Sequence, residues 1–384
     1  MAEDTQSTIT YGIFNESAEY ESRVALTPDI VKRLKRSAVT CVIESNAGQA
    51  AGYSDDDYTA AGAQVVSKDG VIAKAQVFGF VNRPDDELVA KLPKGAWVIG
   101  MLGSFTDQDY VDRLQQAGLV GVAIEKLPRQ LSSAQSMDEM TSQNSVMGYK
   151  AVLKAADEYG SFFPMMTTAA GTIRPAKVLV LGAGIAGLQA IGTARRLGAV
   201  VTAYDVRPAS KGEVESLGAK FLDLGLDFSK GQGEGGYARQ LTAEEQAAQQ
   251  AAVDKKASEF DVVITTAKVP GRKPPMLLTK AGVDGLHRGA VIVDCAASDL
   301  GGNVEGSKPN ETVTTANVVR IIGAPDLASG VATTASNLLS RNVADVLTHF
   351  VNDGALSMDL NEELDDALIV AGRVEAPAAD EGKE

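Results

Sequence analysis

The chain has 384 residues, of which 45% are hydrophobic and 22% charged, as expected for a globular protein of two or three domains. Its 36 Lys and Arg against 50 Asp and Glu give a formal net charge of −14, which disfavours binding to nucleic acid or to an anionic membrane surface. Two cysteines, Cys41 and Cys295, and two histidines, His287 and His349, are too few for a disulfide framework or a His/Cys metal site, so we expect no metal.

The first third of the sequence alternates short apolar runs with amphipathic segments, which indicates a parallel α/β sheet. Thr27 and Pro28 are typical of a helix start, with Thr27 as N-cap and Pro28 at the first helical position. We expect strands at residues 11–14, 39–44, 63–66, 76–81, 96–101 and 120–124, and helices at 28–35, 55–61 and 110–116.

The remaining sequence predicts a second unit of the same kind. We expect a long helix at 142–160, strands at 177–181, 200–204, 262–266, 290–294 and 319–322, a helix at 331–351 and a late strand at 367–374. The apolar stretch 178–194 approaches the length of a membrane span, but its glycines and its change from strand-like to helix-like pattern indicate a strand, loop and helix in a folded core. The predicted fold is α/β, with two Rossmann-like doubly wound parallel-sheet domains joined by long helices. The first is discontinuous (1–140 and 331–384), and the second covers 141–330.

A glycine motif in the second unit predicts a dinucleotide site. Gly182, Gly184 and Gly187 form G-x-G-x-x-G between a β-branched strand and an amphipathic helix, with Ile185 at the helix start. In this motif the first glycine permits the turn, the second lets a pyrophosphate approach the backbone, and the third lets helix pack on strand. The phosphates would lie at the helix N-terminus, where free N–H groups favour an anion. The alternative is a degenerate Rossmann domain that binds no ligand.

Asp205 ends the next strand, about 20 residues past the glycines, where a carboxylate binds ribose hydroxyls and repels a 2′-phosphate. It therefore predicts NAD(H) over NADP(H), although Arg207 nearby could accommodate a 2′-phosphate. The small residues Thr266 and Ala267 end a further strand and could lie against the cofactor. Asp294 could contact ligand or cap a helix, and Cys295 is expected to be core.

Several ordered segments resemble the family that contains alanine dehydrogenase and the α subunit of proton-translocating nicotinamide nucleotide transhydrogenase. Residues 21–28 (Glu-Ser-Arg-Val-Ala-Leu-Thr-Pro) are similar to a signature shared by both branches. The transhydrogenase branch is resembled more closely by segments 134–138, 163–166, 169–172, 187–190, 203–207 and 235–238.

This resemblance implies an NAD(H)-binding component of two Rossmann-like domains, often a homodimer, that exchanges hydride with NADP(H) held on a separate β subunit. The family's membrane helices are absent from this sequence. A three-chain arrangement is therefore implied, in which this subunit docks on a membrane subunit and the NADP(H)-binding β subunit at the cytoplasmic face of the inner membrane.

The resemblance also implies site residues. In the family an Arg-Gln-Asp loop positions the nicotinamide, and Gln135 and Asp138 match its last two members; Arg129 stands one place before the family's Arg, which leaves its role open. The further cofactor contacts implied are Thr141 (Ser in the family), Val206, Gln249 and Lys268 (apolar in the family), with Gly236 and Tyr237 on a glycine-rich segment, 224–236, expected to be mobile and to close over the cofactor.

Three functions compete: hydride transfer between nicotinamides, oxidative deamination as in alanine dehydrogenase, and a non-catalytic NAD-binding role. An amino acid dehydrogenase needs a positioned acid and base. The catalytic Lys and His of that branch are replaced by Phe80 and Met101, and a further Lys by Asn15, while Arg23 remains as either a carboxylate clamp or an ion-pair residue. Hydride transfer between nicotinamides needs no protein acid or base, so the sequence favours transhydrogenation.

Overall fold

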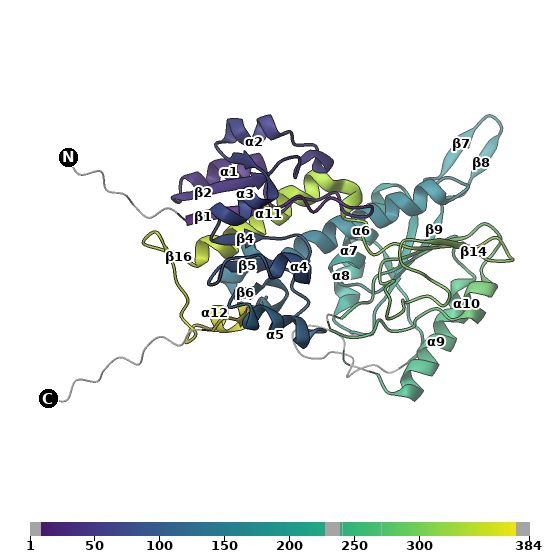
Figure 1. Ribbon diagram of the computed structural model, residues 1–384. Helices are drawn as coiled ribbons and strands as arrows, with labels where there is room; N and C mark the ends of the chain where they lie inside the picture. Colours follow the sequence, from purple (N-terminus) through teal and green to yellow (C-terminus); the bar gives the residue numbers. More distant parts are fainter. Residues whose placement is uncertain (1–8, 227–238, 240, 270, 374–384) are drawn as a thin grey trace, which may run out of the picture. The chain divides into compact units, whose positions relative to one another are not determined.

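The computed structural model describes residues 9–226, 239, 241–269 and 271–373, and its contacts divide the chain into two compact units. Unit 1 comprises Met1–Gln143 and Ala332–Glu384, and unit 2 comprises Asn144–Val331. The chain leaves unit 1 within helix α6 (Glu139–Glu158) and re-enters it at the start of helix α11 (Ala332–His349). Each unit is built on its own seven-stranded sheet (Figure 1).

The sheet of unit 1 has the strand order β3-β2-β1-β4-β5-β6-β18, and every pair is parallel except β6 with β18. Its strands are β1 (Ile9–Ile13), β2 (Val39–Glu44), β3 (Gln64–Val66), β4 (Val77–Gly79), β5 (Trp97–Gly100), β6 (Val120–Ala123) and β18 (Ile369–Ala371). Its helices besides α6 and α11 are α1 (Pro28–Lys35), α2 (Asp55–Ala61), α3 (Lys68–Lys74), α4 (Asp86–Val89), α5 (Gln108–Gln116) and α12 (Glu363–Leu368), and β16 (Val351–Asn352) pairs with β17 (Ala355–Leu356) in a small hairpin.

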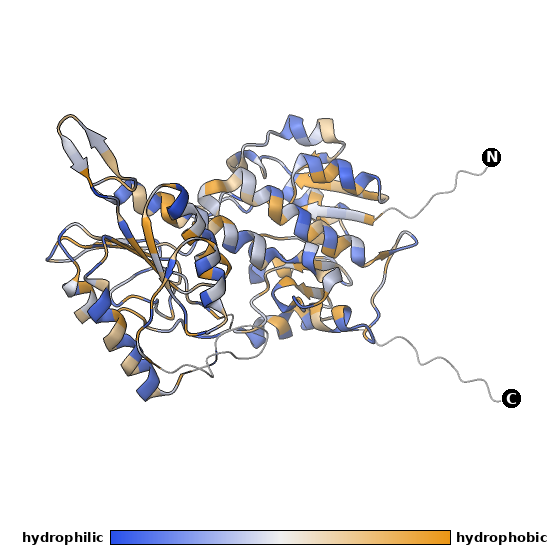
Figure 2. Ribbon diagram, turned by 180° about the vertical axis from the view of Figure 1, so that it is seen from behind, coloured by the Kyte–Doolittle hydropathy of each residue, from blue (hydrophilic) through white to orange (hydrophobic). Residues whose placement is uncertain are grey.

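Apolar side chains alternate onto both faces of this sheet, so each face has a core of its own. Helices α1 and α11 cover one face, and hydroxyls of α11 complete the contact: Ser336 accepts a hydrogen bond from Val24 N, and Ser340 accepts one from Thr27 N. Figure 2 shows the same pattern, with hydrophobic strands inside and mixed helices around them. The discontinuous C-terminal segment is therefore part of the core of unit 1.

The sheet of unit 2 has the order β11-β10-β9-β12-β13-β15-β14, with only β14 antiparallel to its neighbour. Its strands are β9 (Lys177–Leu181), β10 (Val200–Tyr204), β11 (Lys220–Phe221), β12 (Val262–Thr265), β13 (Val291–Asp294), β14 (Thr312–Thr314) and β15 (Arg320–Gly323). The helices between them are α7 (Ile185–Arg196), α8 (Ser210–Ser216), α9 (Ala243–Ala257) and α10 (Lys280–Gly285), and a separate hairpin is formed by β7 (Met166–Thr168) and β8 (Gly171–Ile173).

Strand order in both sheets reverses at one place. In unit 1 the chain builds outward from β1 to β3 and then returns to place β4 on the other side of β1; in unit 2 the same step places β12 beside β9. This is the doubly wound order of Rossmann-like folds, whose ligands bind outside the carboxyl ends of the strands at the reversal. The predicted fold class is confirmed, apart from the antiparallel edge strands β14 and β18.

Some predicted element bounds are wrong. The strand expected at 367–374 is only Ile369–Ala371, because helix α12 occupies the residues up to Leu368. The long helix expected from residue 142 begins at Glu139, since Asp138 accepts a hydrogen bond from Thr141 N and caps it. In the described part of the chain no helix combines the length and hydrophobicity that a membrane span requires, and stretch 178–194 is strand β9, a turn and helix α7.

Candidate functional site

The glycine turn after β9 has the geometry that the motif predicts. Gly182 has a φ of +98°, a conformation that L side chains rarely adopt. A Cβ on Gly187 would lie 1.8 Å from the carbonyl oxygen of Gly182, so only glycine allows α7 to approach the turn. Thr266, at the end of the neighbouring strand, donates from Oγ1 to the same carbonyl at 3.0 Å. The turn is therefore held from both sides by contacts that leave no room for larger residues.

Gly184 differs from the other two glycines because it faces open space. It is exposed, its φ of −77° suits any residue, and a Cβ built on it meets no protein atom within 4 Å. It is the N-cap of α7, so the first N–H groups of that helix, from Ile185 onward, lie beside this space. A pyrophosphate fits here, because the helix end supplies donors and positive potential and the glycine leaves room for an anion.

Asp205 lies directly after β10 and is joined to the glycine turn. Its Oδ2 accepts a hydrogen bond from Ala183 N at 2.8 Å, and its Oδ1 accepts from the backbone N and the Nε of Arg207 at 2.8 and 2.9 Å. Hydrogen bonding to Asp205 raises the pKa of the Arg207 guanidinium. Arg207 is thus paired with the carboxylate, and Val206 between them packs against the core. In Rossmann folds a carboxylate at the end of the second strand can bind the ribose hydroxyls of the cofactor, and Asp205 stands at that strand end.

The other predicted contacts of unit 2 are less closely grouped. Gln249 is buried on α9 and donates from Nε2 to the hydroxyl of Tyr204, the residue before Asp205, at 3.1 Å. Lys268 is exposed just past β12. Gly236 and Tyr237, with most of the segment predicted to close over the cofactor, lie outside the described residues.

In unit 1, three of the residues implied by resemblance form a cluster at the start of α6. Arg129 donates from Nε to Asp138 Oδ2 at 2.8 Å and from Nη2 to the Thr141 hydroxyl at 2.7 Å, and that hydroxyl donates to Asp138 Oδ2 at 2.6 Å. The early position of Arg129 therefore does not separate it from Asp138. Gln135 is exposed on the short 3₁₀ helix η3 (Ser132–Met137) that precedes the cluster.

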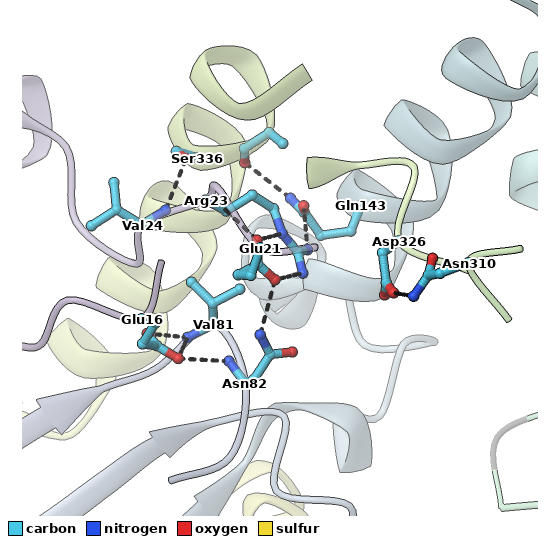
Figure 3. A network of polar contacts seen from close by, with 11 residues as sticks. Glu16, Glu21, Arg23, Val24, Val81, Asn82, Gln143, Asn310, Asp326 and Ser336 are labelled. Carbon is cyan, nitrogen blue, oxygen red and sulfur yellow. Dashed lines mark hydrogen bonds and ion pairs between the residues drawn. The ribbon is translucent and has the colours of Figure 1, made fainter. Parts of the chain in front are cut away.

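Arg23 is an ion-pair residue in this structure. Its guanidinium donates from Nε to Glu21 Oε1 at 2.8 Å and from Nη2 to Glu21 Oε2 at 2.7 Å, a two-point contact, and from Nη1 to Gln143 Oε1 at 3.0 Å (Figure 3). Burial alone would raise the pKa of Glu21, but the hydrogen bonds and charge of Arg23 outweigh it and leave the pKa below its usual value. A substrate carboxylate would have to compete with this pair.

Phe80 and Met101, which by resemblance replace the Lys and His of the alanine dehydrogenase branch, are both apolar, and Phe80 lies in an apolar core. Phe80 is 1% exposed, and its ring lies 5.7 Å from that of Phe14. Met101 is half-buried just after β5. Neither side chain transfers protons, so these positions offer no acid or base to an amino acid substrate.

The carboxyls of Glu16, which is half-buried, and Glu139, which is buried, lie near the Arg23–Glu21 ion pair. Glu16 accepts hydrogen bonds from Val81 N and Asn82 N, at 2.9 and 3.0 Å, across the reversal between β1 and β4 (Figure 3). Burial raises its pKa to about 8. Burial also raises the pKa of Glu139 to about 8, and among the described residues Glu139 Oε2 is one of the few buried side-chain oxygens without a hydrogen-bond partner.

Asn303 is a buried residue at the site of unit 2 that sequence reasoning missed. Its backbone N donates to Asp294 Oδ2 at 3.1 Å, and its side chain bonds both backbone polar groups of Ala267. Asp294 also accepts from Thr265 Oγ1 at 2.8 Å and from Ala296 N at 3.0 Å, so its carboxylate organises the loop and is not free for a ligand. The sequence Gly301-Gly302-Asn303 indicates a loop, but it does not show which residue Asn303 contacts.

The fold and the glycine turn together define a dinucleotide-binding protein with two Rossmann-like units. Comparison with known families gives the same class: residues 12–147 match the model of the alanine dehydrogenase/PNT N-terminal domain, and residues 151–375 match that of its C-terminal domain. The chain belongs to the alanine dehydrogenase/PNT family, a group of oxidoreductases.

Within the family the chain is more similar to transhydrogenase subunits than to alanine dehydrogenases. It is 40% identical over 363 residues to an NAD(P) transhydrogenase subunit alpha chain of Rickettsia prowazekii, covering 92% of each chain. The crystal structure of a transhydrogenase from Sinorhizobium meliloti superposes with a TM-score of 0.83 at 39% identity, covering 94% of this chain and 98% of the other. The alanine dehydrogenase of Mycolicibacterium smegmatis is 31% identical over 78% of this chain and 75% of its own.

Proposed function

We propose that this chain is the NAD(H)-binding subunit of a proton-translocating transhydrogenase, which passes hydride between NAD(H) bound here and NADP(H) on a partner subunit. The observation that carries the proposal is the turn Gly182–Gly187, where the exposed Gly184 leaves open space at the start of α7 and Asp205 is held beside the turn. The transhydrogenase relatives support the choice of reaction, because they cover nearly the whole chain.

The side chains of Phe80, Met101 and Arg23 in unit 1 favour this reaction over amino acid oxidation. Removing hydride from an amino acid requires an acid or base at the reacting carbon and nitrogen. Phe80 and Met101 supply neither, and the guanidinium of Arg23 is already bound at two points by Glu21. An amino acid dehydrogenase would need proton-transferring side chains at positions 80 and 101, and its substrate carboxylate would have to displace Glu21 from Arg23.

Transhydrogenation makes modest demands on the protein. NADH and NADP⁺ become NAD⁺ and NADPH by transfer of one hydride, and the nicotinamides supply that chemistry. The residues of this chain bind the pyrophosphate at α7, select the ribose with Asp205 and orient the nicotinamide with the loop that carries Gln135, Arg129 and Asp138. No proton is exchanged with a side chain, so a site without an acid–base pair is sufficient.

Reconstitution tests this function. The intact chain is mixed with an NADP(H)-binding β domain of the transhydrogenase family, and hydride transfer from NADPH to an NAD⁺ analogue is followed by absorbance. We expect transfer that requires both proteins. The matched variant is Gly184→Ala. The added methyl group meets no protein atom within 4 Å but would project toward the pyrophosphate. The variant should therefore keep its thermal stability and lose both NADH binding and hydride transfer.

Other outcomes select other functions. NADH binding without transfer in the mixture would favour a non-catalytic NAD-binding subunit, whereas NAD⁺-dependent oxidation of alanine by the chain alone would favour the amino acid dehydrogenase. We further propose that the partners are a membrane subunit and an NADP(H)-binding β subunit, that the chain forms a homodimer, and that the assembly lies at the cytoplasmic face of the inner membrane.

A further inference from the structure

Asn303 makes a two-point contact with the backbone of a single residue, Ala267. Its Oδ1 accepts a hydrogen bond from Ala267 N at 2.9 Å, and its Nδ2 donates to Ala267 O at 2.8 Å. Nδ2 also donates to Pro275 O at 2.7 Å. An amide is the side-chain group with a donor and an acceptor arranged side by side, so it alone among short side chains satisfies both groups of Ala267.

The backbone of Asn303 is held as firmly as its side chain. Its carbonyl accepts hydrogen bonds from Leu277 N and Leu278 N, at 2.8 and 3.0 Å, and its N–H donates to Asp294 Oδ2. Asn303 is completely buried. A Cβ on the preceding Gly302 would lie 2.2 Å from Asp294 Oδ2, so the loop passes close to this carboxylate. The contact with Ala267 is therefore a built feature of the loop.

Ala267 lies at the strand reversal of unit 2. Ala267 follows β12, which is the neighbour of β9 in the sheet. The preceding residue, Thr266, donates a hydrogen bond from Oγ1 to Gly182 O in the glycine turn. The same turn is tight against Ala267 itself, since a Cβ on Gly182 would lie 3.0 Å from Ala267 N. A change in the backbone of Ala267 would consequently move the turn that the pyrophosphate needs.

We infer that Asn303 is a positioning residue for the dinucleotide site, which acts on the cofactor through Ala267, Thr266 and the glycine turn without touching it. This inference rests on the proposed function, because it concerns the same NAD(H) site. It predicts an effect on NADH affinity beyond any effect on folding, because loss of the Nδ2 donor frees the segment after β12 at the reversal where the ligand binds.

Asn303→Asp gives the sharpest test. It keeps an acceptor for Ala267 N but puts an oxygen opposite Ala267 O and Pro275 O, in a buried place beside Asp294. Burial and a neighbouring carboxylate both favour the protonated acid, which regains one donor. Relative to the parent, we expect the NADH Kd to rise at least tenfold at pH 8 and to recover at least threefold at pH 6. In the reconstituted assay KM for NADH should rise while kcat at saturation changes less than threefold.

Asn317→Asp is the matched control. Asn317 bonds one backbone carbonyl, Leu286 O at 2.8 Å, and precedes β15 at the amino edge of the same sheet. The Asn317→Asp variant should have a lower thermal stability than the parent and an NADH Kd within twofold of the parent value. If Asn303→Asp does not fold, Asn303→Ser, which restores one small donor, should fold and raise the Kd threefold or more.

The outcomes separate this inference from the function beneath it. A parent chain that does not bind NADH would overturn the proposed function and this inference with it. A parent that binds, with folded Asn303 variants of equal affinity, would overturn the inference alone. So would an affinity loss that is the same at pH 8 and pH 6, or one that Asn317→Asp reproduces.

Discussion

At the residue scale, we propose that Asp205 determines which nucleotide the site accepts. Its carboxylate would bind the ribose hydroxyls of NADH and repel a 2′-phosphate, so we expect NADH to bind at least tenfold more tightly than NADPH in fluorescence titration. Asp205→Ala should lose NADH affinity. It also releases Arg207, whose Nε and Nη2 both bond Asp205, toward the same position. The preference for NADH should therefore shrink on both counts, and equal affinities in the parent chain would refute this role for Asp205.

The matched variant for that experiment is Arg207→Ala, which removes the guanidinium and leaves the carboxylate with its hydrogen bond from Ala183 N. It should keep the preference for NADH, because the carboxylate is the group that repels a 2′-phosphate. If Arg207→Ala instead lost the preference as fully as Asp205→Ala, the pair and not the carboxylate would be the selective element.

The buried carboxyl of Glu139 predicts a pH dependence of stability. Burial raises its pKa to about 8 from an ordinary value near 4.5, so between these pH values the folded chain holds a proton that the unfolded chain releases. Stability should then fall as pH rises through this window, by up to about 1.4 kcal/mol per pH unit from this group. Glu139→Gln resembles the protonated acid and should flatten the decline, as measured by urea denaturation from pH 5.5 to 7.5. Parallel profiles would show that Glu139 ionises normally.

At the element scale, the segment from Arg129 to the first turn of α6 combines two roles. Asp138 caps α6 through Thr141 N and also pairs with Arg129. Asp138→Asn separates these roles, because asparagine caps helices as well as aspartate does but carries no charge. We expect the variant to keep its melting temperature within a few degrees and to transfer hydride at least tenfold more slowly in the reconstituted assay. A melting temperature that falls while the rate is retained would leave the cap as its only role.

A substitution at the exposed residue Gln135 tests whether the same segment orients the nicotinamide. Gln135→Asn shortens the side chain by one methylene, so it should lower the hydride-transfer rate much more than NADH affinity if the amide orients the nicotinamide. Because Gln135 is exposed on η3, the change should have little effect on folding. Hydride transfer at the parental rate with normal NADH binding would show that Gln135 does not orient the nicotinamide.

The sequence predicts elements well where a local pattern has one structural solution. Buried parallel strands such as β9 and β12 are continuous apolar runs, and the glycine turn needs Gly182 for its positive φ and Gly187 for its close approach to Gly182, which are constraints that act within a few residues. Strands β7, β8 and β14 were missed because they are short and mostly exposed, and so have no apolar pattern.

Long-range polar contacts were the part of the site that the sequence could not reveal. Asn303 lies 36 positions from Ala267, and nothing local distinguishes it from any loop asparagine. Arg129 illustrates the reverse case, since its position in the sequence is one place from the family pattern but its side chain still reaches Asp138. A long side chain tolerates a shift of one residue, whereas a two-point backbone contact is visible only in the folded chain.

At the scale of the whole molecule, the proposed homodimer gives a prediction that concerns the β7–β8 hairpin. A two-stranded hairpin is marginally stable by itself, and this one carries exposed apolar side chains in and beside it, with Met165 66% and Ile173 41% exposed. Packing against a second copy would cover them. We expect light scattering to give twice the mass of one chain, and Met165→Asp with Ile173→Asp to give a monomer. Leu300→Asp, at an exposed apolar residue of unit 2 outside the hairpin, is the control and should remain dimeric. A dimer that survives the double change would assign the interface to another surface, and a monomeric parent chain would refute the homodimer.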